Sequence, residues 1–161
     1  MAHTQSLSPL PRNAQSVPFV ELRQSRPSKV AAMFSFEDQL MHFILKFRKD
    51  GGGVDIEMAL HEALANAMIH GNRENSCKRV FVTCRCYMDG EVSITVLDEG
   101  QGFDTSAVLD PTAPEYRLLT HGRGIYLMKA LMDEVSFENG GRAVRMRKAS
   151  NAKPEAGRKR A

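Results

Sequence analysis

The sequence contains no apolar run close to the roughly 20 residues that a membrane-spanning helix needs. Its first residues, MAHTQSLSPLPRNAQS, have no apolar core of the kind found in a secretion signal. There are only three cysteines, Cys77, Cys84 and Cys86, and an odd number without an export signal is typical of reduced thiols in the cytosol. We therefore expect a cytoplasmic protein with no membrane partner.

Several common metal and phosphate motifs are also missing. Cys84 and Cys86 form a C-x-C pair with no second pair downstream, so we expect buried packing residues on one strand face and no zinc site. The run HEALA has Ala65 where a zinc-protease helix needs its second histidine. Neither a Walker Gly-Lys-Ser/Thr nor a Gly-x-Gly-x-x-Gly pattern occurs. Any phosphate or metal site must therefore be built in another way.

The composition is that of one globular domain with a sizeable core, because 42% of the 161 residues are hydrophobic and 25% are charged. The formal net charge of +3 is small and several basic residues fall in the C-terminal tail, so we do not expect direct nucleic-acid binding. Residues 1–16 are rich in Ser, Pro, Gln and Asn, which predicts a disordered arm. We expect a folded domain over residues 17–149, followed by a polar basic tail over 150–161.

The first half of that domain predicts one strand and two helices. Residues 17–22 suggest a short strand, and the apolar spacing over 29–48 predicts a helix with Ser28 as its N-cap and a break near Ser35. A second helix begins with Asp55 as its cap and ends at Gly71, and it is the strongest helical segment of the chain.

The second half predicts two hairpins separated by a loop and a helix. The β-rich runs 78–88 and 91–100 are joined by an Asp-Gly turn, and a second hairpin turns at residues 139–141. Residues 104–120 suggest a long functional loop, and a helix follows Gly122 and Gly124. Antiparallel pairs with helices between them predict an α+β, two-layer sandwich whose mixed, mostly antiparallel sheet carries helices on one face.

Glu62 and Asn66 lie four residues apart, so both side chains leave the same face of the second helix. The stripe expected to pack on the sheet lies beside them and contains Ile56, Leu60, Ala63, Leu64 and Ala67. A carboxylate and an amide on such a surface need partners, which nearby backbone, a ligand or a metal could supply. This spacing alone favours ordinary backbone partners.

Two glycine-containing segments could contact a ligand through the backbone. In DEGQGF, Gly100 and Gly102 permit close approach to a flat ligand, and Asp98 at the strand end is an acceptor suited to an exocyclic amine. In HGRG, Gly122 and Gly124 come before a helix whose free N–H groups suit phosphates, and Arg123 adds charge. Each segment alone is equally compatible with an ordinary turn or an ordinary helix start.

Together, the segments EMALHEALANAMIHGN, LDEGQGF and HGRGIYLMKALMDEV resemble, in this order, the N, G1 and G2 boxes of the GHKL ATPase superfamily, whose ATP-binding unit is the Bergerat fold. The run Glu-Ala-x-x-Asn-Ala-x-x-His-Gly and the short length are most similar to the bacterial anti-sigma factor serine-protein kinases. The resemblance covers about residues 17–148.

The resemblance implies ATP and Mg²⁺ as cofactors and a role for each matching residue. It makes Asn66 the Mg²⁺ ligand, Glu62 the catalytic base, and Asp98 the partner of the adenine amine. Residues 104–120 would form the ATP lid. Further nucleotide contacts are implied for Gly100, Gly102, Phe103, His121, Gly122, Arg123, Gly124 and Ile125. His121 stands where many relatives have a small residue, which implies a stiffer lid hinge.

The implied function is that of an anti-sigma factor kinase. Such a protein phosphorylates a serine of a small STAS-type anti-sigma-factor antagonist and sequesters a sigma factor, commonly as a homodimer. The alternative is an ATP-bound regulatory module that holds a protein partner without efficient phosphotransfer. A sensor histidine kinase ranks lower, since no phosphoacceptor helix precedes the domain, and a gyrase-type protein would need a further transducer domain.

Overall fold

The computed structural model describes residues 17–48, 50–104 and 120–151. The predicted N-terminal arm, nearly all of the predicted lid and most of the tail lie outside these ranges, so the domain limits stay a prediction. Within the described ranges, no helix has the length and apolar character needed to cross a membrane.

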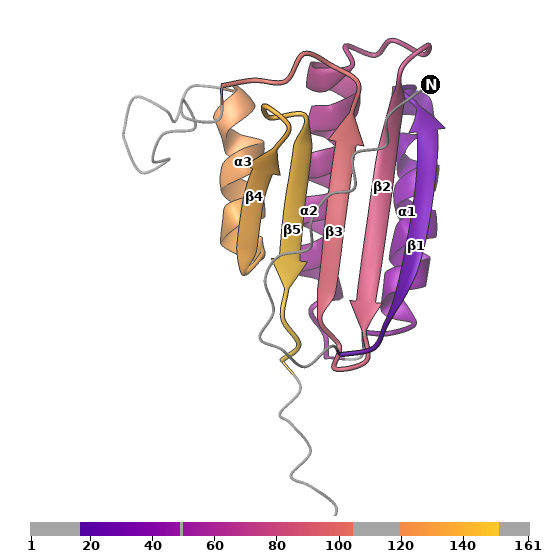
Figure 1. The fold of residues 1–161 in the computed structure, drawn as a ribbon, viewed down its shortest axis with the longest axis vertical. Coiled ribbons are helices and arrows are strands. Elements are labelled where there is room, and N and C mark those ends of the chain that lie inside the picture. The colour runs from indigo at the N-terminus through magenta and orange to yellow at the C-terminus, as the bar shows by residue number, and fades with distance from the viewer. Residues whose placement is uncertain (1–16, 49, 105–119, 152–161) are drawn as a thin grey trace, which may run out of the picture.

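The described chain forms one five-stranded sheet with the order β1-β2-β3-β5-β4 (Figure 1). Every pairing in it is antiparallel, which is simpler than the mixed sheet expected from the sequence. The strands are β1 (Phe19–Pro27), β2 (Arg79–Tyr87), β3 (Val92–Asp98), β4 (Glu134–Glu138) and β5 (Ala143–Lys148). Both predicted hairpins are confirmed, and positive φ angles at Gly90, Asn139, Gly140 and Gly141 fit the predicted turns.

The helices cover one face of this sheet, as predicted (Figure 1). They are α1 (Met33–Leu45), α2 (Gly53–Ala65) and α3 (Thr120–Leu131), with a short 3₁₀ turn, η1 (Val30–Ala32), and a π-helical turn, η2 (Asn66–Gly71). The break expected near Ser35 falls three residues earlier, between η1 and α1.

The core lies between the sheet and the helices. The predicted stripe along α2 and the start of η2 is confirmed, because each of its five residues is no more than 4% exposed. Alternate residues of β2 and β3 meet this stripe, and Cys84 pairs with Ile94 on the same side. Burying such apolar side chains is the main favourable term in forming the fold.

Two predicted helix caps are wrong. Ser28 is buried and its hydroxyl accepts a hydrogen bond from the Asn72 amide. The N-cap positions of η1 and α1 are Lys29 and Ala32, and neither side chain makes a capping hydrogen bond. Asp55 lies in the first turn of α2, after the actual N-cap Gly52, and its carboxylate pairs with Lys148. In both cases the polar side chain bonds to a residue distant in sequence, whereas the local sequence pattern predicted a bond to the backbone at the start of a helix.

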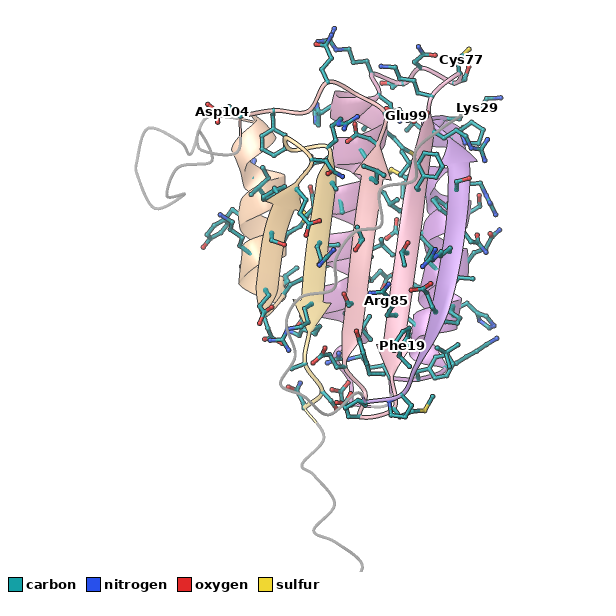
Figure 2. All side chains as sticks on the ribbon, viewed as in Figure 1. Phe19, Lys29, Cys77, Arg85, Glu99 and Asp104 are labelled. Atoms are coloured by element: carbon teal, nitrogen blue, oxygen red, sulfur yellow. The ribbon has the colours of Figure 1, made fainter. Side chains whose placement is uncertain are left out.

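The face of the sheet without helices carries mostly polar side chains. On it, Glu21 accepts a hydrogen bond from Arg85, and the Arg85 guanidinium lies 5.4 Å from the centre of the Phe19 ring. Figure 2 shows Phe19 and Arg85 near the same end of this face.

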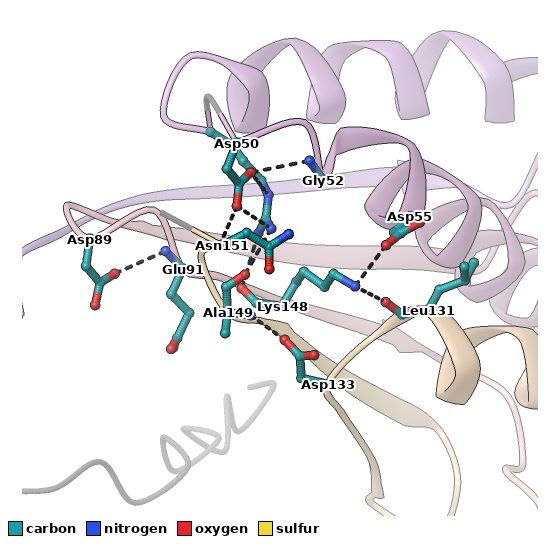
Figure 3. A network of polar contacts seen from close by, with 11 residues as sticks. Asp50, Gly52, Asp55, Asp89, Glu91, Leu131, Asp133, Lys148, Ala149 and Asn151 are labelled. Atoms are coloured by element: carbon teal, nitrogen blue, oxygen red, sulfur yellow. Dashed lines mark hydrogen bonds and ion pairs between the residues drawn. The ribbon is translucent and has the colours of Figure 1, made fainter. Parts of the chain in front are cut away.

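A polar network joins the end of β5 to the helices, and we call it the C-terminal clasp (Figure 3). The buried Arg48 guanidinium donates to Asp50 and to the carbonyl of Ala149, both at 2.9 Å. The ammonium of Lys148 donates to Asp55 at 2.9 Å and to the carbonyl of Leu131 at 2.5 Å. The clasp therefore ties the start of α2 and the end of α3 to one strand.

Candidate functional site

Helix α2 presents Glu62 near its C-terminal end and continues directly into the π-helical turn η2, which begins at Asn66. The wider turn ends where the backbone N–H of Asn72 donates to the carbonyl of Ala67 at 2.9 Å. Glu62 and Asn66 are both partly exposed beside the buried Ala59 and Ala63. Single π turns within helices occur frequently at functional sites.

Glu62 and Asn66 face Gly124 of α3. A methyl group on Gly124 would lie 2.5 Å from Oε2 of Glu62 and 3.7 Å from Nδ2 of Asn66. Gly124 is itself buried, so the absence of a side chain there is what lets α3 lie against the two polar groups. The structure thus brings together three of the residues expected at the site.

The start of α3 corrects one expectation. The helix begins at Thr120, so Gly122, Arg123 and Gly124 lie within its first two turns instead of in a loop before it. Of these residues, Arg123 is exposed. Ile125 packs against the core. The side chain of His121 and the burial of Gly122 lie outside the described set.

Asp98, at the end of β3, is only 7% exposed and lies between two glycines. A methyl group on Gly71 would meet the Asp98 Cγ at 2.5 Å, and one on Gly100 would meet Oδ1 at 2.7 Å. The backbone N–H of Gly100 donates to Oδ1 at 2.7 Å. Burial raises the pKa of the Asp98 carboxyl, an effect opposed by that hydrogen bond and by the charges of Arg142 and Lys78.

The rest of the predicted G1 loop is fixed to the β4–β5 hairpin. Gly102 has φ +75° and lies so close to the carbonyl of Gly140 that no side chain could be accommodated. Phe103 donates its N–H to the same carbonyl at 3.0 Å, and its ring meets Phe137 edge-on at 5.3 Å. Phe103 is thus placed on the hairpin, and the described contacts do not bring it to Asp98.

A polar hollow opens between η2 and the G1 loop. It is lined by His70, Gly71, Arg73, Lys78, Gln101 and Gly102. Its cationic side chains suit an anionic or polar part of a ligand whose other end reaches Asp98. Arg73 and Lys78 lie outside the three segments that carry the resemblance, so the sequence did not indicate them. Gln101 lies inside LDEGQGF, between the two glycines, but the resemblance implied no role for its side chain.

All these features gather at one end of the molecule. Figure 1 shows the end of β3 and the start of α3 at the same end, opposite the C-terminal clasp. The missing side chains of Gly71 and Gly100 allow the buried Asp98 carboxylate to lie between them, where it is an acceptor suited to an amine of a ligand. The Asn66 side chain can offer a hard oxygen ligand of the type that Mg²⁺ prefers, and the N-terminal end of α3 suits phosphates. The residues present therefore fit Mg²⁺ and a purine nucleotide.

Comparison with known proteins agrees with this geometry. Residues 25–148 match the family described as "Histidine kinase-like ATPase domain". A crystal structure of the RsbU and RsbW domains of Rv1364c from Mycobacterium tuberculosis has the same fold, with a TM-score of 0.56 at 20% identity, covering 81% of this chain and 32% of that one.

Curated relatives include an anti-sigma F factor of Heyndrickxia coagulans, 36% identical over 57% of this chain and 66% of the relative. The serine-protein kinase RsbW of Bacillus subtilis is 34% identical over 53% of this chain and 56% of the relative. The chain therefore aligns with only part of these two relatives. An anti-sigma F factor of Clostridium botulinum strain Eklund 17B is 30% identical over 86% of this chain and 96% of the relative. The chain belongs to the histidine kinase-like (GHKL) ATPase domain family.

Proposed function

We propose that this protein is an ATP-dependent serine-protein kinase that acts as an anti-sigma factor. It phosphorylates a serine of an anti-sigma-factor antagonist and sequesters a sigma factor. The names of its relatives, anti-sigma F factor and serine-protein kinase RsbW, support both halves of this proposal.

The observation that carries the proposal is the approach of Gly124 to Glu62 and Asn66, at the same end of the molecule as Asp98. An enzyme that transfers a phosphoryl group needs positioning and charge neutralisation more than covalent chemistry. Asp98 is a buried acceptor for the adenine ring, Asn66 offers an amide for the metal, and Glu62 is the carboxylate that serves as general base. Together they meet that need with few residues.

Each side chain then has a stated task. Asp98 accepts a hydrogen bond from the adenine amine, and Gly71 and Gly100 allow its carboxylate to be held between them. Asn66 holds Mg²⁺, which when bound neutralises phosphate charge. Glu62 accepts the proton of the target serine hydroxyl, and Gly124 leaves its Oε2 atom unobstructed.

Phosphotransfer is tested with radiolabelled ATP, Mg²⁺ and a STAS-type antagonist domain. Label should appear on the antagonist. Glu62→Gln should reduce the rate of phosphotransfer by roughly 10²–10⁴-fold, the usual contribution of a general base. Glu57→Gln is the matched control, because Glu57 is an exposed carboxylate of the same helix. A complex that forms without label would instead favour the ATP-bound regulatory module.

Sequestration is tested separately by copurification of the ATP-loaded protein with candidate sigma factors. A complex that dissociates when unphosphorylated antagonist is added supports the anti-sigma role. Failure of every sigma factor of the source cell to bind would remove that role and leave the kinase proposal standing.

A further inference from the structure

Asn72 follows the π-helical turn and is the residue that joins it to the rest of the candidate site. Its side chain is only 1% exposed and makes three hydrogen bonds. Nδ2 donates to the Ser28 hydroxyl at 2.7 Å and to the carbonyl of Arg79 at 2.8 Å, while Oδ1 accepts from the backbone N–H of Glu99 at 2.9 Å. Three segments distant in sequence therefore meet at one amide.

The bond to Glu99 acts on the residue that precedes it, Asp98. The Asp98 N–H is held by the carbonyl of Arg142 at 3.0 Å, so the backbone on both sides of the Asp98 carbonyl is fixed. Gly71, directly before Asn72, has its carbonyl 2.1 Å from where a side chain on Gly100 would begin. Asn72 consequently sets the separation between Gly71 and the Asp98–Gly100 turn.

Only an asparagine-like group satisfies all three partners. The amide has one acceptor oxygen and a two-proton donor, and the three bonds use both ends. Reversing it would direct Nδ2 at the Glu99 N–H and Oδ1 at the Arg79 carbonyl, so its orientation is determined by its surroundings. Losing the group leaves buried donors and acceptors without partners.

We infer that Asn72 is a positioning residue for base recognition: through the Glu99 N–H it holds Asp98 at the depth where its carboxylate meets a purine 6-amino group. This inference rests on the proposed nucleotide site. It assigns to Asn72 a share of the selectivity for ATP over purine nucleotides that lack this amine, although Asn72 itself touches no part of the base.

The test compares calorimetric dissociation constants for Mg-ATP and for purine riboside triphosphate, which has no 6-amino group. Wild type should favour ATP by about tenfold or more, because the analogue leaves a buried acceptor unpaired. Asn72→Ala should reduce this ratio to below about threefold. Asn72→Asp keeps the acceptor for Glu99 and should retain most of the ratio, even though its unfolding temperature falls.

Ser28→Ala is the matched control, since it removes one partner of Asn72 and leaves the Glu99 bond in place. Ser28→Ala should have a lower unfolding temperature but an unchanged ratio of the two dissociation constants. In an Asp98→Asn background, Asn72→Ala should cause no further loss of selectivity, which a merely structural role would not predict.

Each outcome decides something. A wild-type ratio retained in Asn72→Ala, or lost equally in Ser28→Ala, overturns the inference and leaves the nucleotide site intact. If Asn72→Ala does not fold, loss of the ratio in a folded Asn72→Asp overturns it instead. Failure of the wild type to bind either nucleotide overturns the proposed function itself.

Discussion

Gly124 lies so close to Glu62 that a single added methyl group would meet the Glu62 Oε2 atom at 2.5 Å. The two residues lie 62 positions apart in sequence, on α3 and α2, and the Glu62 Oε2 atom is the nearest atom to that methyl position outside the local backbone of α3. The contact explains why a glycine is tolerated inside α3, where it costs roughly 1 kcal/mol relative to alanine.

This contact gives the first prediction, for Gly124→Ala. The fold should persist, because the obstructed atom is the mobile end of a glutamate and alanine favours the helix. Glu62 must turn away, so phosphotransfer should fall by at least about tenfold while the unfolding temperature stays equal or rises. Phosphotransfer assays and thermal melts measure the two effects on the same sample. Unchanged phosphotransfer would show that Glu62 is not the base or does not need its present position.

The second prediction concerns Asp98→Asn, which should weaken nucleotide binding and yet stabilise the free protein at neutral pH. Burial raises the Asp98 pKa in the folded state, so the folded state binds that proton more tightly than the unfolded chain does. The ionised carboxylate therefore costs stability above its folded pKa, and this cost disappears below its ordinary value of 3.8. Asparagine avoids the cost and can still accept from the Gly100 N–H.

At pH 7.5 we expect Asp98→Asn to raise the unfolding temperature, by about 2–4 °C for each kcal/mol added to the free energy of unfolding. The gain should shrink as the pH is lowered toward 4. Melting curves of both proteins across this pH range give the measurement. A destabilised Asp98→Asn at neutral pH would mean that the charge is better satisfied than its burial indicates.

The third prediction concerns the C-terminal clasp. Arg48 is 4% exposed and bonds Asp50 and two backbone carbonyls, so Arg48→Met leaves the partly buried Asp50 carboxylate without its cation. Breaking such a pair costs roughly 3–5 kcal/mol. Chemical denaturation should show a loss of this size, while Lys46→Met, at an exposed position just before it, should change little. Equal stability of Arg48→Met and wild type would contradict the role given to the clasp.

The clasp also predicts sensitivity to acid. Burial raises the pKa of Asp50, but the N–H groups of Asn151 and Gly52 and the charge of Arg48 outweigh it and lower the pKa overall. A lowered carboxyl pKa contributes stability above the ordinary value, and that stability is lost as the pH falls through the folded pKa. Asp50→Asn should therefore lose less stability than wild type between about pH 5 and pH 2 in denaturation experiments.

A fifth prediction follows from the thiols. Burial raises the pKa of Cys84 to about 12 and of Cys86 to about 11, whereas Cys77 is exposed. A thiol reagent at pH 8 should modify one cysteine rapidly in the native protein and all three after denaturation. Rapid modification that persists in Cys77→Ser would show that β2 opens in the native state.

Much of the fold could be predicted because its signals are local. The Asp-Gly turn and the alternation of β2 and β3 define the first hairpin, and the apolar stripe of α2 identifies its buried face. The site residues Glu62, Asn66 and Asp98 could be selected because they fall in three segments that resemble one family. Their spatial roles stay predictions until a nucleotide is bound.

What could not be predicted depends on partners distant in sequence. Ser28 and Asp55 fit local capping patterns, yet tertiary partners, Asn72 and Lys148, hold them instead. Gly124 suggested a loop because glycine disfavours helices, whereas packing against Glu62 places it inside one. Asn72 was overlooked because nothing around it in sequence indicates that Arg79 and Glu99 will meet there.

The central claim is that one Mg-nucleotide lies between Asp98 and the Asn66–Gly124 contact. Calorimetric titration with ATP, in the presence and absence of Mg²⁺, on wild type and Asn66→Ala tests it most directly. We predict Mg²⁺-dependent binding to wild type and weaker, Mg²⁺-independent binding to Asn66→Ala. An absence of heat with wild type, or an unchanged Mg²⁺ dependence in Asn66→Ala, would contradict the account.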